Sequence, residues 1–259
     1  MNISIIIGWI LSFGMVIFGI MNGGDIGQFI DINSVFITIG GTIGVLIASF
    51  PLSMLKSIPT LLKISILPRK YNHKKTIDDI VEYAKIARSK GLISLENSAN
   101  EASDPFLKSS LLLIIDANDT DKVRGMLDDA IDFMSDRHDT NRGFFDKGVA
   151  VFPAFGMLGT LIGLVQMLAT MDSDPDSLGA NMAVALITTF YGSLFANVLF
   201  APISSALKSA HEEEVLNMRI VEEGVLSIAS GMNPRYIQEK LEFMLPKKAL
   251  KQKSNTNKE

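Results

Sequence analysis

The chain has 259 residues, of which 47% are hydrophobic and 20% charged, with a formal net charge of −4. Its mean hydropathy is +0.29, and a positive value beside this many charges indicates a chain that lies partly in lipid and partly in water, not a soluble globule. It contains no cysteine, which excludes disulfides and thiolate metal sites. Its three histidines lie far apart in the sequence and lack the close ligand spacing of zinc sites. We therefore expect no metal centre.

Four uncharged apolar runs divide the sequence, at residues 3–21, 34–55, 148–171 and 179–207. Each can cross a hydrocarbon core of about 30 Å, for which a helix needs about 20 residues. The first run has no basic n-region and no small-x-small cleavage site, so we do not interpret it as a cleaved signal peptide. The sequence predicts an all-α polytopic membrane protein with four transmembrane helices.

The predicted domains follow from these runs. Residues 1–55 hold transmembrane helices 1 and 2, residues 56–147 form a cytoplasmic helical domain, residues 148–207 hold transmembrane helices 3 and 4, and residues 208–259 form C-terminal cytoplasmic helices with a Lys-rich tail.

The positive charges predict the orientation of the chain. All 24 Lys and Arg residues lie within residues 51–147 and 208–259. Because cytoplasmic loops retain Lys and Arg, both stretches should be inside the cell. An even number of crossings then places both termini in the cytoplasm. The links at residues 22–33 and 172–177 carry only acidic charges, at Asp25, Asp31, Asp172, Asp174 and Asp176, which fits an external location.

Between the second and third runs, helical periodicity dominates. Thr76 is the expected N-cap of a helix that ends at Gly91, and shorter helices should follow at Ser94–Glu101 and Pro105–Ile115. An amphipathic helix from Val123 to Met134 should lead into the third crossing.

The C-terminal part should also be helical. A charged helix follows the fourth crossing, and Gly231 and Pro234 should break it before a last short helix. The sequence has no strand pattern, phosphate-binding loop or dinucleotide fingerprint, so we expect neither an enzyme nor a resident cofactor.

Small and hydroxyl-bearing residues mark the membrane helices. Gly156, Gly159, Thr160 and Gly163 share a face of the third crossing, Ala185, Thr189, Ser193 and Asn197 recur every fourth residue on the fourth, and Gly40, Gly44 and Ala48 do so on the second. For the glycines we expect close helix packing, since small residues let backbones approach in lipid. The threonine hydroxyls either bond their own helix or line a polar path.

No Asp, Glu, Lys, Arg or His lies in any of the four runs, although a group of this kind within the membrane normally marks an ion pathway. The chain is therefore either a passive scaffold or the polar wall around a carboxylate that a partner helix supplies. Pro153 and Pro202, each at the inner end of its crossing, favour the second interpretation, because a proline frees a backbone carbonyl and makes a kink or a hinge.

The segments FPAFGMLGTLIGL (Phe152 to Leu164) and NMAVALITTFYGSLFANVLFAPI (Asn181 to Ile203) resemble the third and fourth helices of the MotA and PomA family of flagellar stator subunits. The run ARSKGLISLE (Ala87 to Glu96) looks like the rotor-facing segment of that family. The resemblance covers essentially the whole chain. The third and fourth helices alone also resemble the ExbB and TolQ energisers, but those proteins usually have three crossings.

The resemblance implies a set of roles. Arg88 and Glu96 match the charges that engage the rotor switch protein of the flagellar C-ring, although two such charges on exposed helices otherwise indicate a solvated surface. Pro153 and Pro202 match the prolines that couple ion movement to conformation. Thr160 and Thr189 match hydroxyls near the ion-binding aspartate of a MotB-like partner.

We place Ser193, one turn beyond Thr189, on the same path. The family further implies a ring of five copies around two partner chains in the inner membrane. The transported ion is H⁺ or Na⁺; we favour H⁺ because the side chains do not complete a sodium cage. An energiser of envelope transport, a structural scaffold and a conventional transporter remain the alternatives.

Overall fold

The computed structural model describes residues 2–116 and 119–246, and no strand occurs within these ranges. Four helices are long and apolar enough to span a membrane, as the sequence predicts: Ile3–Gly23, Ile32–Ser49, and parts of Thr120–Thr170 and Pro175–Ala229. The all-α membrane fold is thereby confirmed. The chain divides into two compact units. We call Met1–Arg69 with His138–Ala210 the membrane unit, and Lys70–Arg137 with His211–Glu259 the charged unit.

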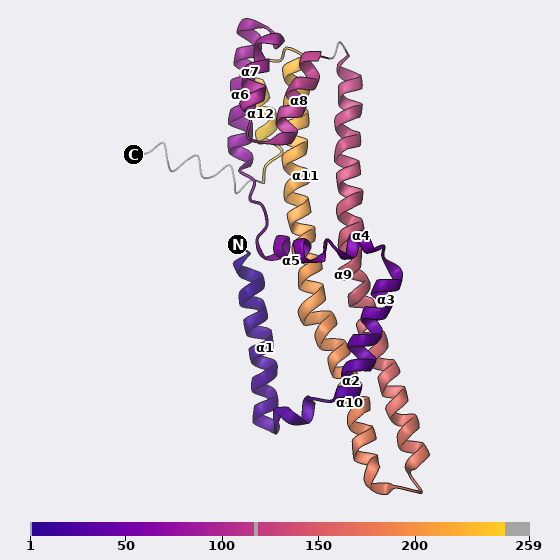
Figure 1. Ribbon diagram of the computed structural model, residues 1–259. Coiled ribbons are helices and arrows are strands. Elements are labelled where there is room, and N and C mark those ends of the chain that lie inside the picture. Colours follow the sequence, from indigo (N-terminus) through magenta and orange to yellow (C-terminus); the bar gives the residue numbers. More distant parts are fainter. Residues whose placement is uncertain (1, 117–118, 247–259) are drawn as a thin grey trace. The chain divides into compact units, whose positions relative to one another are not determined.

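The first half of the membrane unit contains α1 (Ile3–Gly23), the short 3₁₀ helix η1 (Ile26–Phe29), and a second crossing built from α2 (Ile32–Val35), the π-helical η2 (Phe36–Gly40) and α3 (Gly41–Ser49) (Figure 1). Asp25 and Asp31 accept hydrogen bonds from the backbone N–H groups that begin η1 and α2. The acidic residues of this link are therefore helix caps.

The second crossing is shorter than the predicted run of residues 34–55. It ends at Ser49 because Phe50 is extended, with φ −131° and ψ 145°. Phe50 precedes Pro51, and the ring of a proline disfavours helical backbone at the residue before it. The chain continues through α4 (Leu52–Leu55) into α5 (Ile58–Ile66).

The second half of the membrane unit is a helical hairpin. The third crossing is the last part of α9 (Thr120–Thr170), and η4 (Pro175–Ser177) leads into α10 (Leu178–Leu194), the π-helical η5 (Phe195–Phe200) and α11 (Ala201–Ala229). Because Pro202 lacks an N–H and its ring crowds the carbonyl four residues earlier, the wider π turn just before it relieves that clash.

Apolar packing near one end of the crossings holds the membrane unit together. Leu46, Met54, Leu61, Phe144, Phe145, Ile203 and Leu207 form its buried cluster. The amphipathic α5 contributes Leu61, and the N–H of Asn2 donates to the carbonyl of Ile66 at 2.7 Å. The start of α1 is thus tied to the end of α5.

The charged unit contains α6 (His73–Lys90), the 3₁₀ helix η3 (Leu92–Ser94), α7 (Leu95–Glu101), α8 (Pro105–Asp116), the first part of α9, the last part of α11, and α12 (Pro234–Glu242). Its core is aliphatic, and Ile80, Leu95, Leu111, Ile220, Ile237 and Leu241 are fully buried in it. The amphipathic helix that starts at residue 120 runs without a break into the third crossing, as predicted.

One predicted helix start was wrong. α6 begins at His73, and its N-cap is Asn72, whose side chain accepts from the N–H of Lys75 at 3.1 Å. The hydroxyl of Thr76 bonds Asn217 Oδ1 at 3.0 Å instead. The predicted end at Gly91 is confirmed, because Gly91 has φ +83°, a conformation that favours glycine.

Candidate functional site

Two threonine hydroxyls meet where the third and fourth crossings touch. Oγ1 of Thr160 on α9 lies 2.5 Å from Oγ1 of Thr189 on α10. The Thr160 hydroxyl also lies 3.1 Å from the carbonyl oxygen of Gly156 and 3.0 Å from that of Ala185. Two hydroxyls have only two protons to donate, so oxygen lone pairs stay free to accept from a further donor or to contact a cation.

The two hydroxyls differ in exposure. Thr160 is half-buried, whereas Thr189 is exposed. The pair therefore presents oxygen atoms on a face of the hairpin that this chain does not itself cover.

The glycines of the third crossing set the distance between these two helices. A Cβ added at Gly159 would lie 2.4 Å from Cβ of Thr188, and one at Gly163 would lie 2.7 Å from the carbonyl oxygen of Asn181. At Gly156 the nearest atom would be the carbonyl oxygen of Thr188, at 3.1 Å. Only glycine permits this approach, which in turn brings the threonine hydroxyls within bonding distance.

On the fourth crossing, a line of polar groups continues from the threonine pair. Ser193 and Asn197 are exposed, as Thr189 is, and follow it at intervals of four residues. The Asn197 side chain donates to the carbonyl oxygen of Ser193 at 3.0 Å. The three sequence-predicted path residues Thr160, Thr189 and Ser193 therefore share one face of the hairpin.

A buried row of hydroxyls on the second crossing was missed in the sequence analysis. Ser34, Thr38 and Thr42 are fully buried. The first two donate to the carbonyl oxygens of Val184 and Thr188, at 3.5 and 3.4 Å, whereas no partner of the Thr42 hydroxyl is found among the described residues. Their spacing of four was visible in the sequence and is the signal that could have revealed them.

The predicted small residues Gly40 and Gly44 of the second crossing do not pack closely against another helix of this chain. A Cβ at Gly40 or Gly44 would meet no atom within 4 Å, whereas one at Gly41 would lie 2.2 Å from the ring of Phe155. Within this chain, Gly41 is the glycine of the second crossing at which the third crossing packs.

An aromatic group lies beside the two prolines. Phe152, next to Pro153, stacks on Phe195 with ring centroids 5.4 Å apart and meets the edge of Phe200 at 4.9 Å. Phe195 and Phe200 are the two ends of the π turn that precedes Pro202. The two prolines therefore flank one packed aromatic contact between the third and fourth crossings.

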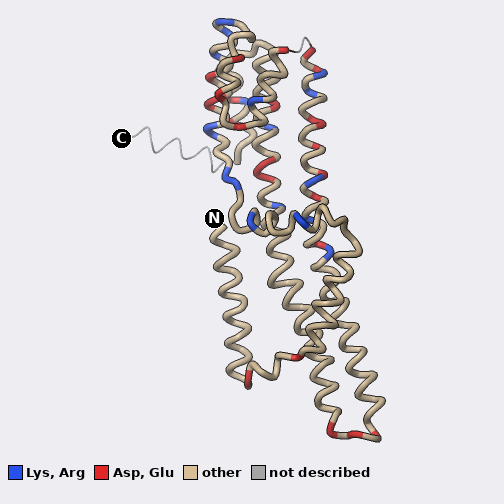
Figure 2. The backbone as a smooth tube through the Cα atoms, viewed as in Figure 1, with Lys and Arg blue, Asp and Glu red and all other residues tan. Residues whose placement is uncertain are grey.

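Charged groups begin just beyond this contact. Asp146 on α9 accepts from the hydroxyl of Ser204 at 2.5 Å and pairs with Arg142 at 3.2 Å. The stretches of α1, α3 and α10 carry no charged side chain, and acidic residues mark the turns that join α1 to α2 and α9 to η4 (Figure 2).

Arg88 and Glu96 lie in the charged unit. Arg88 is in the last turn of α6 and Glu96 in the first turn of α7, and both are exposed. Among the described residues, neither side chain takes part in an ion pair. Both charges are therefore available to a partner.

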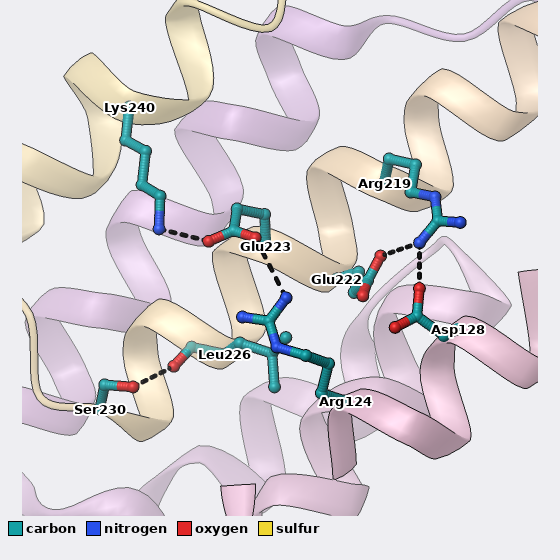
Figure 3. A network of polar contacts seen from close by, with 8 residues as sticks. All are labelled: Arg124, Asp128, Arg219, Glu222, Glu223, Leu226, Ser230 and Lys240. Atoms are coloured by element: carbon teal, nitrogen blue, oxygen red, sulfur yellow. Dashed lines mark hydrogen bonds and ion pairs between the residues drawn. The ribbon is translucent and has the colours of Figure 1, made fainter. Parts of the chain in front are cut away.

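The charged unit also contains an ionic network (Figure 3). Arg219 on α11 pairs with Asp128 on α9 and, at 2.9 Å, with Glu222. Glu223 on the same helix pairs with Lys240 on α12 and, at 3.7 Å, with Arg124 on α9. Burial raises the pKa of the Glu222 carboxyl, and the Arg219 guanidinium opposes this shift without cancelling it.

Known proteins resemble this chain over nearly its full length. Residues 98–220 match the model of the MotA/TolQ/ExbB proton channel family. A motility protein A of Borreliella burgdorferi is 40% identical over 95% of this chain and 95% of its own length. The chain belongs to the motility protein A family. Another relative is the chemotaxis protein PomA of Vibrio alginolyticus, 37% identical over 95% of this chain and 96% of its own.

Solved structures of the family agree with the fold. The flagellar MotAB stator complex from Bacillus subtilis matches with a TM-score of 0.84 at 32% identity, covering 94% of this chain and 96% of that one. The MotAB structure of C. jejuni matches with a TM-score of 0.86 at 25% identity, covering 95% and 96%. This motility protein A family member is therefore a membrane protein with the fold of a stator A chain.

Proposed function

We propose that this chain is the A subunit of a flagellar stator, which couples ion flow across the inner membrane to torque on the rotor. One observation carries the ion-path part of the proposal. The paired hydroxyls of Thr160 and Thr189 lie on an uncovered face of a hairpin whose crossings contain no Asp, Glu, Lys, Arg or His. A wall of this kind can surround an ion-binding group but cannot titrate by itself.

The missing carboxylate would come from a MotB-like partner. An aspartate on a partner helix, placed against Thr160 and Thr189, would bind the ion, and binding would neutralise a charge that is costly in lipid. Each elementary charge that crosses a potential of 100 mV releases about 2.3 kcal/mol. Neutralisation would change which copy of this chain the partner prefers, so a ring of copies, five around two partners as the family implies, would step around it.

The charge distribution supports an orientation with both termini in the cytoplasm. Lys and Arg are confined to residues 51–147 and 208–259, which the positive-inside rule places on the cytoplasmic side. The charged unit would then lie inside the cell, where the rotor is.

Arg88 and Glu96 would contact the rotor switch protein. They lie at the end of α6 and the start of α7, exposed and without an ion-pair partner in the described chain. Exposed charges steer association through complementary charges on a partner, which fits a contact that must form and break at each step.

We favour H⁺ as the coupling ion. The free lone pairs of Thr160 and Thr189 can order water for proton transfer, and the carbonyl oxygens of Gly156 and Ala185 beside them already lie within hydrogen-bond distance of the Thr160 hydroxyl. Na⁺ would need several further oxygen ligands from the partner.

The test is the swimming speed of a cell that lacks its own stator, complemented with this chain and its MotB-like partner while external sodium varies at fixed pH. Rotation that ignores sodium and stops with a protonophore supports a proton-driven motor. Rotation that tracks sodium assigns Na⁺ to the Thr160–Thr189 path. No rotation, despite membrane insertion and partner binding, would contradict the stator function and favour an energiser.

A further inference from the structure

Four charged side chains pair helix α9 with helix α11 in the charged unit. Arg124 of α9 pairs with Glu223 of α11 at 3.7 Å, and Asp128 of α9 pairs with Arg219 of α11. As the residue number rises by four on α9, it falls by four on α11, so the two helices run antiparallel and one ion pair follows the other by about one turn.

The order of the charges opposes sliding in one direction. A slide of one turn, about 5.4 Å, would bring Arg124 opposite Arg219 and place two cations face to face. Asp128 would then lie opposite Val215 and lose its partner.

A slide in the other direction is opposed as well. It would place Asp128 opposite Glu223 and leave Arg124 without an acid. Arg219 would meet Asp132, which is already 3.8 Å away, so one of the two native pairs would be replaced while the other became a repulsion. Each neighbouring register therefore loses attraction and gains a contact between like charges.

Apolar packing does not specify this register as strongly. The buried residues of α9 recur every three or four positions, at Val123, Leu127, Ile131 and Met134. Apolar residues with that repeat still face apolar residues of the other helix after a slide of one turn. In such helix pairs, charged residues fix the register.

The network reaches a third helix. Lys240 of α12 pairs with the same Glu223 that meets Arg124, and α12 packs along α6, which carries Arg88. Glu223 thus joins α9, α11 and α12 through one carboxylate (Figure 3).

We infer that Arg124, Asp128, Arg219, Glu223 and Lys240 form a register lock that holds α9, α11 and α12 as one body. α9 and α11 are the helices that continue from the third and fourth crossings. A lock between them prevents relative sliding, so axial force that arrives through either helix is passed to α12 and to α6, the helix that carries Arg88. The register of the lock is a property of this chain, and its role in torque rests on the proposed function.

The experiment uses Glu223→Arg and the triple variant Arg124→Glu, Glu223→Arg, Lys240→Glu, each expressed with the partner in a stator-less cell. The single change puts three cations together, and the triple change restores the network with reversed polarity. The control reverses the exposed pair Arg235–Glu239 within α12. We expect Glu223→Arg to lose most torque at high load and to keep its low-load speed, with recovery in the triple variant and no change in the control.

Register is read separately by cross-linking, because the chain has no cysteine. Cysteines at Leu127 and Ile220 report the native register. Cysteines at Ile131 and Ile220 report the slide of one turn that brings Asp128 opposite position 223, which Glu223→Arg favours because Asp128 can pair with the new cation. Beside a cysteine-free partner, Glu223→Arg should lower the first yield severalfold and raise the second, and the triple variant should reverse both changes.

Two outcomes would overturn the lock. One is an unchanged cross-linking pattern in Glu223→Arg, whatever its torque; the other is wild-type torque at high load despite a changed pattern. If the wild-type complex does not turn the motor at all, the proposed function fails, while the cross-linking result still decides the register.

Discussion

Gly159→Ala tests whether the threonine pair depends on close contact between the third and fourth crossings. The added Cβ would lie 2.4 Å from Cβ and Cγ2 of Thr188, whereas ordinary contact begins at 3.4 Å. Thr188 is fully buried and its hydroxyl is bonded to the carbonyl oxygens of Val184 and Ala185, so it has little room to move. The helices must therefore separate by about 1 Å, the difference of the two distances, at an overpacking cost of about 1–3 kcal/mol.

That separation would lengthen the 2.5 Å contact between Thr160 and Thr189 to about 3.5 Å, beyond hydrogen-bond distance. We expect Gly159→Ala to insert and bind its partner but to swim at a small fraction of wild-type speed. The assay is swimming speed at matched membrane levels, with thermal unfolding of the purified complex alongside.

Gly44→Ala is the matched control, because its Cβ would meet no atom of this chain within 4 Å. Swimming of Gly159→Ala at the speed of Gly44→Ala would refute the link between glycine contact and function.

Three further predictions concern single groups. Thr189→Val should abolish rotation and Thr189→Ser should retain most of it, measured as swimming speed at equal expression, since only a hydroxyl can pair with Thr160. Pro202→Leu should restore an N–H to the ladder and stop rotation without loss of insertion; full-speed rotation would exclude a coupling role. Burial raises the pKa of Glu222, so its protonated form is favoured by folding. Its contribution to stability is therefore greatest at low pH and falls as pH rises through the folded pKa. Glu222→Gln should be at least as stable as wild type near neutral pH, with the difference shrinking in acid; thermal unfolding of the complex against pH checks this sign.

The membrane helices were predictable because the physics that forms them is local. An uncharged run of about 20 residues can be counted in the sequence, and the absence of Lys and Arg from such a run is visible there too. The predicted second crossing was too long, because hydropathy does not reveal the extended backbone that Pro51 imposes on Phe50.

The approach of the third and fourth crossings was also visible, in the spacing of Gly156, Gly159 and Gly163. The helix that each glycine contacts could not be predicted, since a pattern of small residues does not say which helix it meets. Gly40 and Gly44 matched that pattern and meet nothing in this chain, while Gly41 does. The ionic register between α9 and α11 requires the pairing of residues 91 and 99 positions apart, which no local period shows.

The two π-helical segments have a consequence for movement. A π turn holds one residue more than an α-helix of the same height, and shifting that extra residue along the chain by one position rotates the stretch it passes by about 100°. η5 lies between the polar line at Thr189 and Ser193 and the fixed Pro202. Migration of this bulge toward the threonines would turn Ser193 and Asn197 away from the face of Thr160 and Thr189 while both ends of the helix stay in place. The fourth crossing thus contains the geometry of a rotary switch that needs no hinge and no broken helix.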